Sequence, residues 1–256
     1  MGRLASSGIS IMILFGRKVE VEVAGLKISA VKIAFEIERK SDQTPVSGFV
    51  ELWNLSKEHE SLIYERGKTA RLIAGYDNSM GVIYDGAVER IVRSRSSLSR
   101  ITRLELTGKV SAPDKLGAVV SRTWAGKTKV RSIIKDIVEK DLKLEVGPLD
   151  AISPDAVLDN FSWTGGGIQG LKSVCATQGV RWFDDDGVIR FNRLGMEQAD
   201  LAEIQLSKET GLIGRPSVTD DGVQATSLQF HHRAYAGKRT EKGGRLNAII
   251  LSLIHI

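Results

Sequence analysis

The feature that most constrains the fold is an alternation of apolar and polar residues with a period of two, which dominates from residue 8 to about residue 110. Residues 19–23 have the sequence VEVEV, and residues 31–37 have the sequence VKIAFEI. Successive side chains of a β-strand point to opposite faces of the sheet, so each segment has one face for a core and one for water or a partner. The pattern predicts a β-rich N-terminal region.

Further strands and one short helix are expected in this region. Ser56 can cap a helix, because its hydroxyl accepts a backbone N–H at a helix start, and Gly67 can end it. Six or seven strands with one small helix predict a closed or nearly closed β-barrel over residues 1–118. The additional strands are expected at residues 1–14, 48–55, 69–76, 82–93 and 101–107.

After residue 118 the periodicity changes to that of helices. One amphipathic helix is expected near residues 130–138, capped by Thr128, and a second near residues 167–178, followed by Gly179. A hairpin then turns at residues 184–187, where three Asp residues precede a Gly. We predict a small α/β domain at residues 119–200 and the beginning of a second β-barrel at residues 201–250. The predicted fold class is mainly β with an α+β insert.

Composition and charge exclude several classes of protein. The chain has 256 residues, of which 42% are hydrophobic and 26% charged, as in ordinary globular proteins. Its longest apolar runs, 11–15 and 248–251, are too short to span a bilayer, and its single cysteine excludes an internal disulfide. The net charge is +5. The densest basic stretch, residues 90–103, has no interleaved aromatics, so we interpret it as a solvated strand face rather than a nucleic-acid site.

One glycine motif resembles a dinucleotide-binding fingerprint by its spacing. Gly165, Gly167 and Gly170 form G-x-G-x-x-G before a predicted helix, and Asp184 follows at a suitable distance. The preceding residues, 158–163, lack the continuous apolar character of a buried parallel strand. A nucleotide-binding enzyme that uses the Gly165–Gly170 loop therefore stays an alternative of a different class.

Other chemistry is sparse in the sequence. Cys175 falls on the apolar stripe of its predicted helix and is expected in the core. His231 and His232 would point to opposite faces of a strand, which suits no shared metal. His59 and His255 have no companions at ligand spacing. We predict no catalytic, cofactor-binding or metal-binding residues and no cofactor, so a structural or binding role is favoured over an enzyme.

Several segments resemble a known family. Residues 50–56 (VELWNLS), a short helix, and residues 81–86 (GVIYDG) are similar to the N-terminal, tail-tube-like β-barrel of phage tail and baseplate hub proteins, the late control protein D and VgrG-like hubs. Residues 206–214 (LSKETGLIG) and 221–228 resemble the entry into the second barrel of these hubs. The helix and hairpin between them are similar to the small α/β insert of the family.

The resemblance implies a structural role in the virion. Such a hub assembles as a homotrimer and adapts the six-fold tail tube to the three-fold central spike. Its partners would be the tail tube protein, the spike, and other baseplate and tape-measure proteins, with DNA passing through the lumen without sequence-specific binding. The protein would be assembled in the bacterial host cytoplasm and reside in the tail baseplate. A spike component of a type VI-like secretion system is the alternative within the same class.

The C-terminal end departs from the family pattern. The second barrel should continue well past Leu228, but residues 229–244 are basic and polar. Residues 251–256 (LSLIHI) match the translation of an end sequence used in transposon-based sequencing libraries. We expect that the reading frame runs into adapter sequence there; longer reads of the locus that show native coding sequence after this hexapeptide would contradict this.

Overall fold

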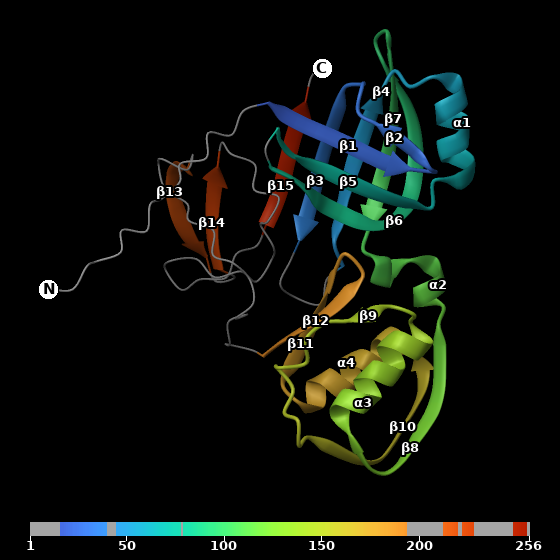
Figure 1. Ribbon diagram of the computed structural model, residues 1–256, viewed down its shortest axis with the longest axis vertical. Helices are drawn as coiled ribbons and strands as arrows, with labels where there is room; N and C mark the ends of the chain where they lie inside the picture. Colours follow the sequence, from blue (N-terminus) through green and yellow to red (C-terminus); the bar gives the residue numbers. More distant parts are fainter. Residues whose placement is uncertain are drawn as a thin grey trace, which may run out of the picture.

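Two hydrophobic cores organise the protein, one in a large curled sheet and one in a smaller α/β unit (Figure 1). The computed structural model describes residues 16–39, 45–77, 79–193, 212–219, 222–227 and 248–254. The sheet unit consists of β1 (Arg17–Val23), β2 (Leu26–Ile28), β3 (Ile33–Arg39), β4 (Ser47–Trp53), α1 (Lys57–Arg66), β5 (Thr69–Tyr76), β6 (Ser79–Ser96), β7 (Ser99–Thr107) and β15 (Ala248–Ile254).

The sheet unit is built on eight antiparallel strands in the order β15-β3-β4-β7-β6-β5-β1-β2. The predicted β-rich class is therefore confirmed. The sheet curls, but β2 and β15 are its two edges, and no pairing among the described strands joins them into a closed barrel. Its edge strand β2 contributes only three residues, which pair with β1 through Val21, Glu22 and Val23.

The apolar positions of the predicted alternation lie in the core of the sheet unit. Val19, Val21 and Val23 are buried, as are Phe35 and Ile37 on β3. The strands at 48–55, 69–76 and 101–107 are confirmed within two residues at each end, whereas β6 is considerably longer than predicted. The strand expected at residues 1–14 lies outside the described residues.

Helix α1 follows its predicted signals. The hydroxyl of Ser56 accepts the N–H of His59 at 3.1 Å, and Gly67 forms the C-cap. Ile63 is fully buried and belongs to the core of the sheet unit. The helix therefore attaches to the sheet through a single buried side chain and through the polar contacts described below.

The α/β unit packs two helical segments against two small sheets. β10 pairs antiparallel with β8, and a three-stranded sheet has the order β11-β12-β9, with β9 parallel to β12. The elements are η1 (Lys109–Ser111), α2 (Pro113–Leu116), β8 (Val119–Lys129), α3 (Val130–Lys135), the π-helix η2 (Asp136–Asp141), β9 (Glu145–Val146), β10 (Val157–Gly166), α4 (Gly167–Thr177), β11 (Val180–Asp185) and β12 (Val188–Arg193).

One predicted helix start is wrong. Thr128 is not the cap of α3: it lies in β8 and its hydroxyl donates to the carbonyl of Ala125 at 3.3 Å. Lys129 occupies the N-cap position and makes no side-chain capping bond. The strand β8 continues directly into the helix, because pairing with β10 extends to the last residue before it. The apolar stripe is confirmed, since Ile133, Ile134 and Ile137 are fully buried.

The C-terminal strands are described in part. β13 (Leu212–Thr219) and β14 (Gly222–Ser227) form an antiparallel pair, and β15 pairs with β3 over seven residues. Residues 220 and 221, between β13 and β14, lie outside the described residues. The division at residues 118, 200 and 250 stays a prediction. Across the described ranges, none of the helices combines the length and apolar character needed to cross a bilayer.

Candidate assembly surface

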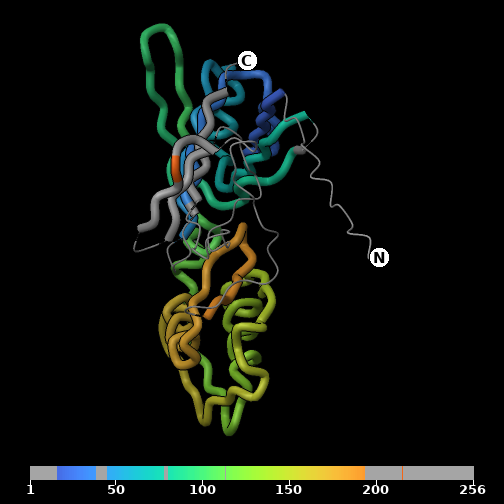
Figure 2. The backbone as a smooth tube through the Cα atoms, turned by 90° about the vertical axis from the view of Figure 1, so that its left-hand side faces the viewer, coloured from blue at the N-terminus to red at the C-terminus, as the bar shows by residue number. Residues whose placement is uncertain are grey.

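The β6–β7 hairpin extends beyond the rest of the sheet and forms an arm, residues 94–100 (Figure 2). Pairing between β5 and β6 stops at Ala87, and pairing between β4 and β7 stops at Ile101, whereas β6 and β7 remain paired to Ser96 and Ser99. Leu98 at the tip is completely exposed. Among the described residues, the arm is thus a two-stranded projection whose outer edges pair with no further strand, and its end is apolar.

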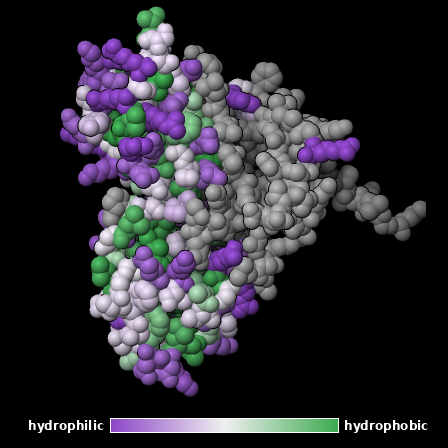
Figure 3. Space-filling view, turned by 180° about the vertical axis from the view of Figure 1, so that it is seen from behind, coloured by the Kyte–Doolittle hydropathy of each residue, from purple (hydrophilic) through white to green (hydrophobic). Residues whose placement is uncertain are grey.

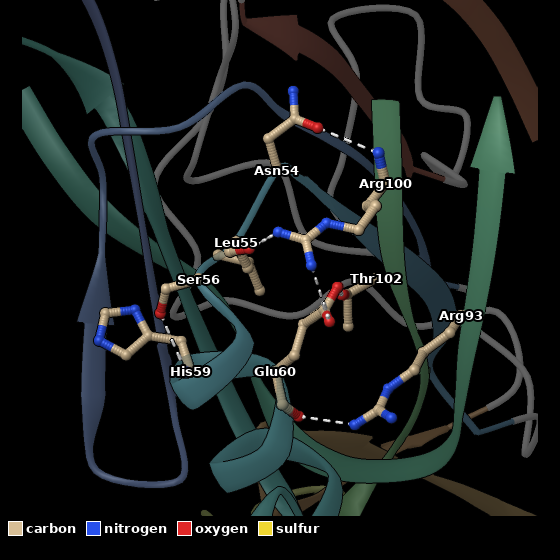
Figure 4. A network of polar contacts seen from close by, with 8 residues as sticks. All are labelled: Asn54, Leu55, Ser56, His59, Glu60, Arg93, Arg100 and Thr102. Atoms are coloured by element: carbon tan, nitrogen blue, oxygen red, sulfur yellow. Dashed lines mark hydrogen bonds and ion pairs between the residues drawn. The ribbon is translucent and has the colours of Figure 1, made fainter. Parts of the chain in front are cut away.

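The base of the arm is fixed by Arg100 (Figure 4). Its guanidinium donates to the carbonyl of Leu55 at 2.9 Å, and its N–H donates to Oδ1 of Asn54 at 3.0 Å. The N–H of Asn54 in turn donates to the carbonyl of Arg100 at 2.8 Å. Asn54 makes this reciprocal pair with a left-handed backbone (φ +54°), a conformation that Asn tolerates better than most residues.

Glu60 connects helix α1 to the same base. Its carboxylate lies 3.9 Å from the guanidinium of Arg100 and accepts from the hydroxyl of Thr102 at 3.3 Å. Its carbonyl accepts from Arg93 at 3.1 Å, and the Arg93 guanidinium lies 4.6 Å from the ring centroid of Tyr64. Figure 4 shows Glu60, Arg93 and Arg100 converging between the helix and the two strands. The helix thus supports the arm.

An open groove of about 490 Å³ lies beside the base of the arm. The Lys32 ammonium lies 4.6 Å from the ring centroid of Trp53 at this groove. Seen from behind, the surface of the sheet unit is largely hydrophilic, with a hydrophobic tip on the arm (Figure 3). The groove is lined by Ala30, Val31, Lys32, Trp53, Asn54, Ser96 and Ser99.

The basic stretch at residues 90–103 pairs largely with groups of its own chain. Arg90 forms a bidentate bond with Glu105, with N···O distances of 2.8 and 3.0 Å, and this bond holds the pKa of the Glu105 carboxyl below its usual value. Arg103 donates to Glu51 at 2.9 Å and stacks on Phe49. These guanidinium groups are bonded to carboxylates of their own chain and are therefore less available to phosphates. This supports the interpretation of the stretch as a strand face rather than a nucleic-acid site.

The glycine motif at residues 165–170 is filled by side chains. The indole N–H of Trp163 donates to the carbonyl of Gly166 at 3.1 Å, and a Cβ on Gly170 would lie 2.8 Å from that indole nitrogen. A Cβ on Gly167 would meet Leu142 at 2.8 Å. The preceding strand, β10, pairs antiparallel in a two-stranded ribbon rather than in a parallel sheet. The glycines therefore serve close packing of α4.

Gly170→Ala is expected to destabilise the protein by about 1–3 kcal/mol, because the new methyl group displaces a hydrogen-bonded indole. The higher helix propensity of Ala offsets at most about 1 kcal/mol of this. Chemical denaturation monitored by tryptophan fluorescence measures the change, with the exposed Lys172→Ala on the same helix as control. A neutral Gly170→Ala, or a thermal shift of the unchanged protein with a dinucleotide, would contradict the packing role.

The other residues considered for chemistry in the sequence are one cysteine and four histidines. Cys175 is fully buried, and burial raises the pKa of its thiol to about 12. His59 is exposed on α1. His231, His232 and His255 lie outside the described residues. Within the described ranges, no three His, Cys, Asp or Glu side chains are placed to hold a metal ion.

A polar cluster joins the π-helix to β8. A π-helical spacing of five residues brings Asp136 and Asp141 to one side, where Arg122 donates to Asp141 at 3.0 Å. Asp136 accepts from the Trp124 indole at 2.9 Å and pairs with Lys140 at 2.6 Å. Burial raises the pKa of the Asp136 carboxyl, but the bonds from Lys140 and Trp124 and the charges of Lys140 and Arg122 together lower it below its usual value.

Acid should weaken this cluster. Since the folded-state pKa of Asp136 is lowered, its contribution is present at neutral pH and is lost as the pH falls below about 4. We expect Asp136→Asn to cost on the order of 1 kcal/mol at neutral pH and clearly less near pH 3.5. Urea unfolding of both proteins at the two pH values measures this, and a difference that does not depend on pH would contradict the assignment.

The fold of this chain was compared with those of solved structures. A 43 kDa tail protein of prophage MuSo2 from Shewanella oneidensis matches with a TM-score of 0.55 and 13% identity, over 80% of this chain and 62% of that one. A tail protein from Neisseria meningitidis matches with a TM-score of 0.45 and 16% identity, over 68% and 50% of the two chains. A type VI secretion system component from E. coli matches with a TM-score of 0.47 and 12% identity, over 67% and 48%.

The match to the Shewanella tail protein confirms the predicted resemblance to phage tail proteins at the level of fold. This chain spans about three fifths of the length of the Shewanella protein and about half that of the other two. No family model and no curated protein sequence matches it. The arm and its polar base were missed by sequence reasoning; the only signal was the polar run of residues 94–100, which is interrupted by a single leucine.

Proposed function

We propose that this protein is a structural subunit of a phage tail baseplate hub, which assembles as a homotrimer and adapts the six-fold tail tube to the three-fold central spike. The observation that carries the proposal is the fold shared with the Shewanella prophage tail protein. The role is non-enzymatic and needs no cofactor. The virion tail is its site of action, after assembly in the host cytoplasm.

The described surface supports an assembly role. Sheet edges and projecting hairpins are places where another chain adds contacts, and the arm presents both with an exposed Leu98. We propose that the outward faces of β1 and β3 line an inner ring through which DNA passes without sequence-specific contacts. Three subunits with two barrels each, at residues 1–118 and from residue 201 on, would present six similar positions to the tube.

Co-expression tests the adaptor role. The full-length product of the gene is produced with the tail tube and spike proteins encoded beside it, and the mass of the purified complex is measured. We expect three copies of this chain for every spike trimer and every tube ring of six. A complex that forms with a secretion tube and spike would move the protein to a type VI-like apparatus, and failure to bind either partner would contradict the proposal.

The tip of the arm is the sharpest single site for testing self-assembly. We expect Leu98→Ser to lower the trimer fraction in solution, while its free energy of unfolding stays within about 0.5 kcal/mol, because the side chain is completely exposed in the single chain. Val119→Ser, at a valine that is 76% exposed on β8, is the matched control. Light scattering measures the mass of both variants. Equal trimer fractions in the two variants would show that the tip of the arm does not take part in the contact between subunits.

A further inference from the structure

The sheet unit and the α/β unit meet where β7 passes into η1, and the β11–β12 hairpin turns against this junction. Gly108 and Lys109 form the covalent link, and Val110 is the first residue of the second core. The hairpin turns through Asp186 and Gly187, both with positive φ (+57° and +94°). The predicted turn is therefore confirmed, and it lies at the boundary between the two units.

The carboxylate of Asp184 spans this boundary. One oxygen, Oδ1, accepts the N–H of Gly187 at 2.7 Å and closes the turn of its own hairpin. The other oxygen, Oδ2, accepts the N–H of Val110 at 3.1 Å, at the connection between the units. The residue is only 5% exposed, so both bonds are shielded from water. Such charge-assisted bonds are stronger than neutral ones.

A second carboxylate reaches the sheet unit itself. Oδ1 of Asp186 accepts the N–H of Asp85 on β6 at 3.0 Å, across 101 positions of sequence. The side chain of Asp85 in turn pairs with Lys109 at 3.0 Å. The turn is thus bonded both to the connection and to a strand of the large sheet.

Two glycines make this close approach possible. A Cβ on Gly108 would collide with Oδ2 of Asp184, and a Cβ on Gly187 would collide with the stem of Lys109. The N–H of Gly108 also donates to the carbonyl of Val46 at 2.8 Å. Any other residue at these positions would displace the carboxylate of Asp184 or the side chain of Lys109 from these contacts.

We propose that residues 184–187 form a positioning clasp, in which Asp184 and Asp186 hold the α/β unit in one orientation on the sheet unit, and that residues 108–111 act as a hinge when the clasp is removed. The inference does not depend on the proposed function. A hairpin turn alone would not need these two bonds, since each carboxylate accepts from an N–H group outside its hairpin.

Distance measurements between the two units test the clasp in the full chain. Spin labels at Ser61→Cys on α1 and Lys172→Cys on α4, both exposed positions, report on the relative orientation, and the native Cys175 is fully buried. The parent protein is expected to give one narrow distance distribution. Asp184→Ala combined with Asp186→Gly should broaden it, and the exposed Asp155→Asn should leave it unchanged.

Hydrogen exchange supplies a local readout that needs no large change of stability. Asp186→Gly keeps the positive φ and removes the acceptor, so the amide of Asp85 should exchange about 10–100 times faster, while amides of α4 are unchanged. Asp186→Asn retains an oxygen acceptor and should restore slow exchange. A narrow distribution in the double variant, or unchanged exchange at Asp85 in Asp186→Gly, would overturn the proposal. Equal acceleration in α4 would do so as well, since it would indicate a general loss of stability.

Discussion

Ile63→Ala is expected to lower the free energy of unfolding by about 2–5 kcal/mol, the range for truncating a fully buried aliphatic side chain. Ile63 is the single side chain of α1 that is buried, and it packs in the core of the sheet unit. Without it the helix is held chiefly by half-buried polar contacts, which are worth about 1 kcal/mol each or less. The base of the arm should therefore loosen with the helix.

Urea denaturation measures the loss, and the neighbouring Tyr64→Ala is the control. Tyr64 is 61% exposed and contributes mainly its contact with Arg93, so its truncation should cost about 1 kcal/mol or less. A cost for Ile63→Ala no greater than that for Tyr64→Ala would show that α1 is not anchored through the core. Exchange of the Arg100 amide, which donates to Asn54, should increase in Ile63→Ala alone.

Ile134→Ala is the second substitution with a large expected effect, again about 2–5 kcal/mol. Ile134 is fully buried in the middle of the apolar stripe of α3 and belongs to the core of the α/β unit. The cavity would lie in the core of the α/β unit, where close packing limits relaxation around it. Val119→Ala, at an exposed residue of the same unit, should change stability by about 0.5 kcal/mol or less.

The two core variants also test the independence of the cores. Ile134→Ala should accelerate hydrogen exchange first in α3 and α4, and Ile63→Ala first in α1 and its contacts on the arm. Identical exchange patterns in the two variants would show that a single cooperative core spans both units, in contradiction to the separate clusters seen in the structure.

The sequence predicts the strands of the sheet unit well, because residues such as Val21 and Phe35 alternate with charged neighbours and one face is fully buried. The three-residue β2 is too short to carry a pattern. In the ribbon of β8 and β10 only Val120 and Trp124 are buried, so few apolar positions mark these strands in the sequence. The sequence places the cap of α3 at Thr128, because a threonine hydroxyl can accept a backbone N–H at a helix start. In the structure Thr128 lies in β8, where it pairs with Leu158.

Features that depend on tertiary contact could not be predicted. The Gly165–Gly170 motif has the spacing of a phosphate-binding loop, yet Gly170 is explained by the position of Trp163 and Gly167 by that of Leu142, which only the fold reveals. The local sequence predicts the turn, but Asp184 itself lies in β11, and its bond to Val110 joins positions 74 residues apart. The arm follows from where β4 and β5 stop pairing, which no local pattern encodes.

The mass of the protein in solution tests the proposed trimeric hub. Light scattering of the full-length gene product, at several concentrations and without partners, gives the number of subunits. We expect a trimer, because the proposed adaptor between six-fold and three-fold symmetry must itself be three-fold. A well-behaved monomer at all concentrations would contradict the account.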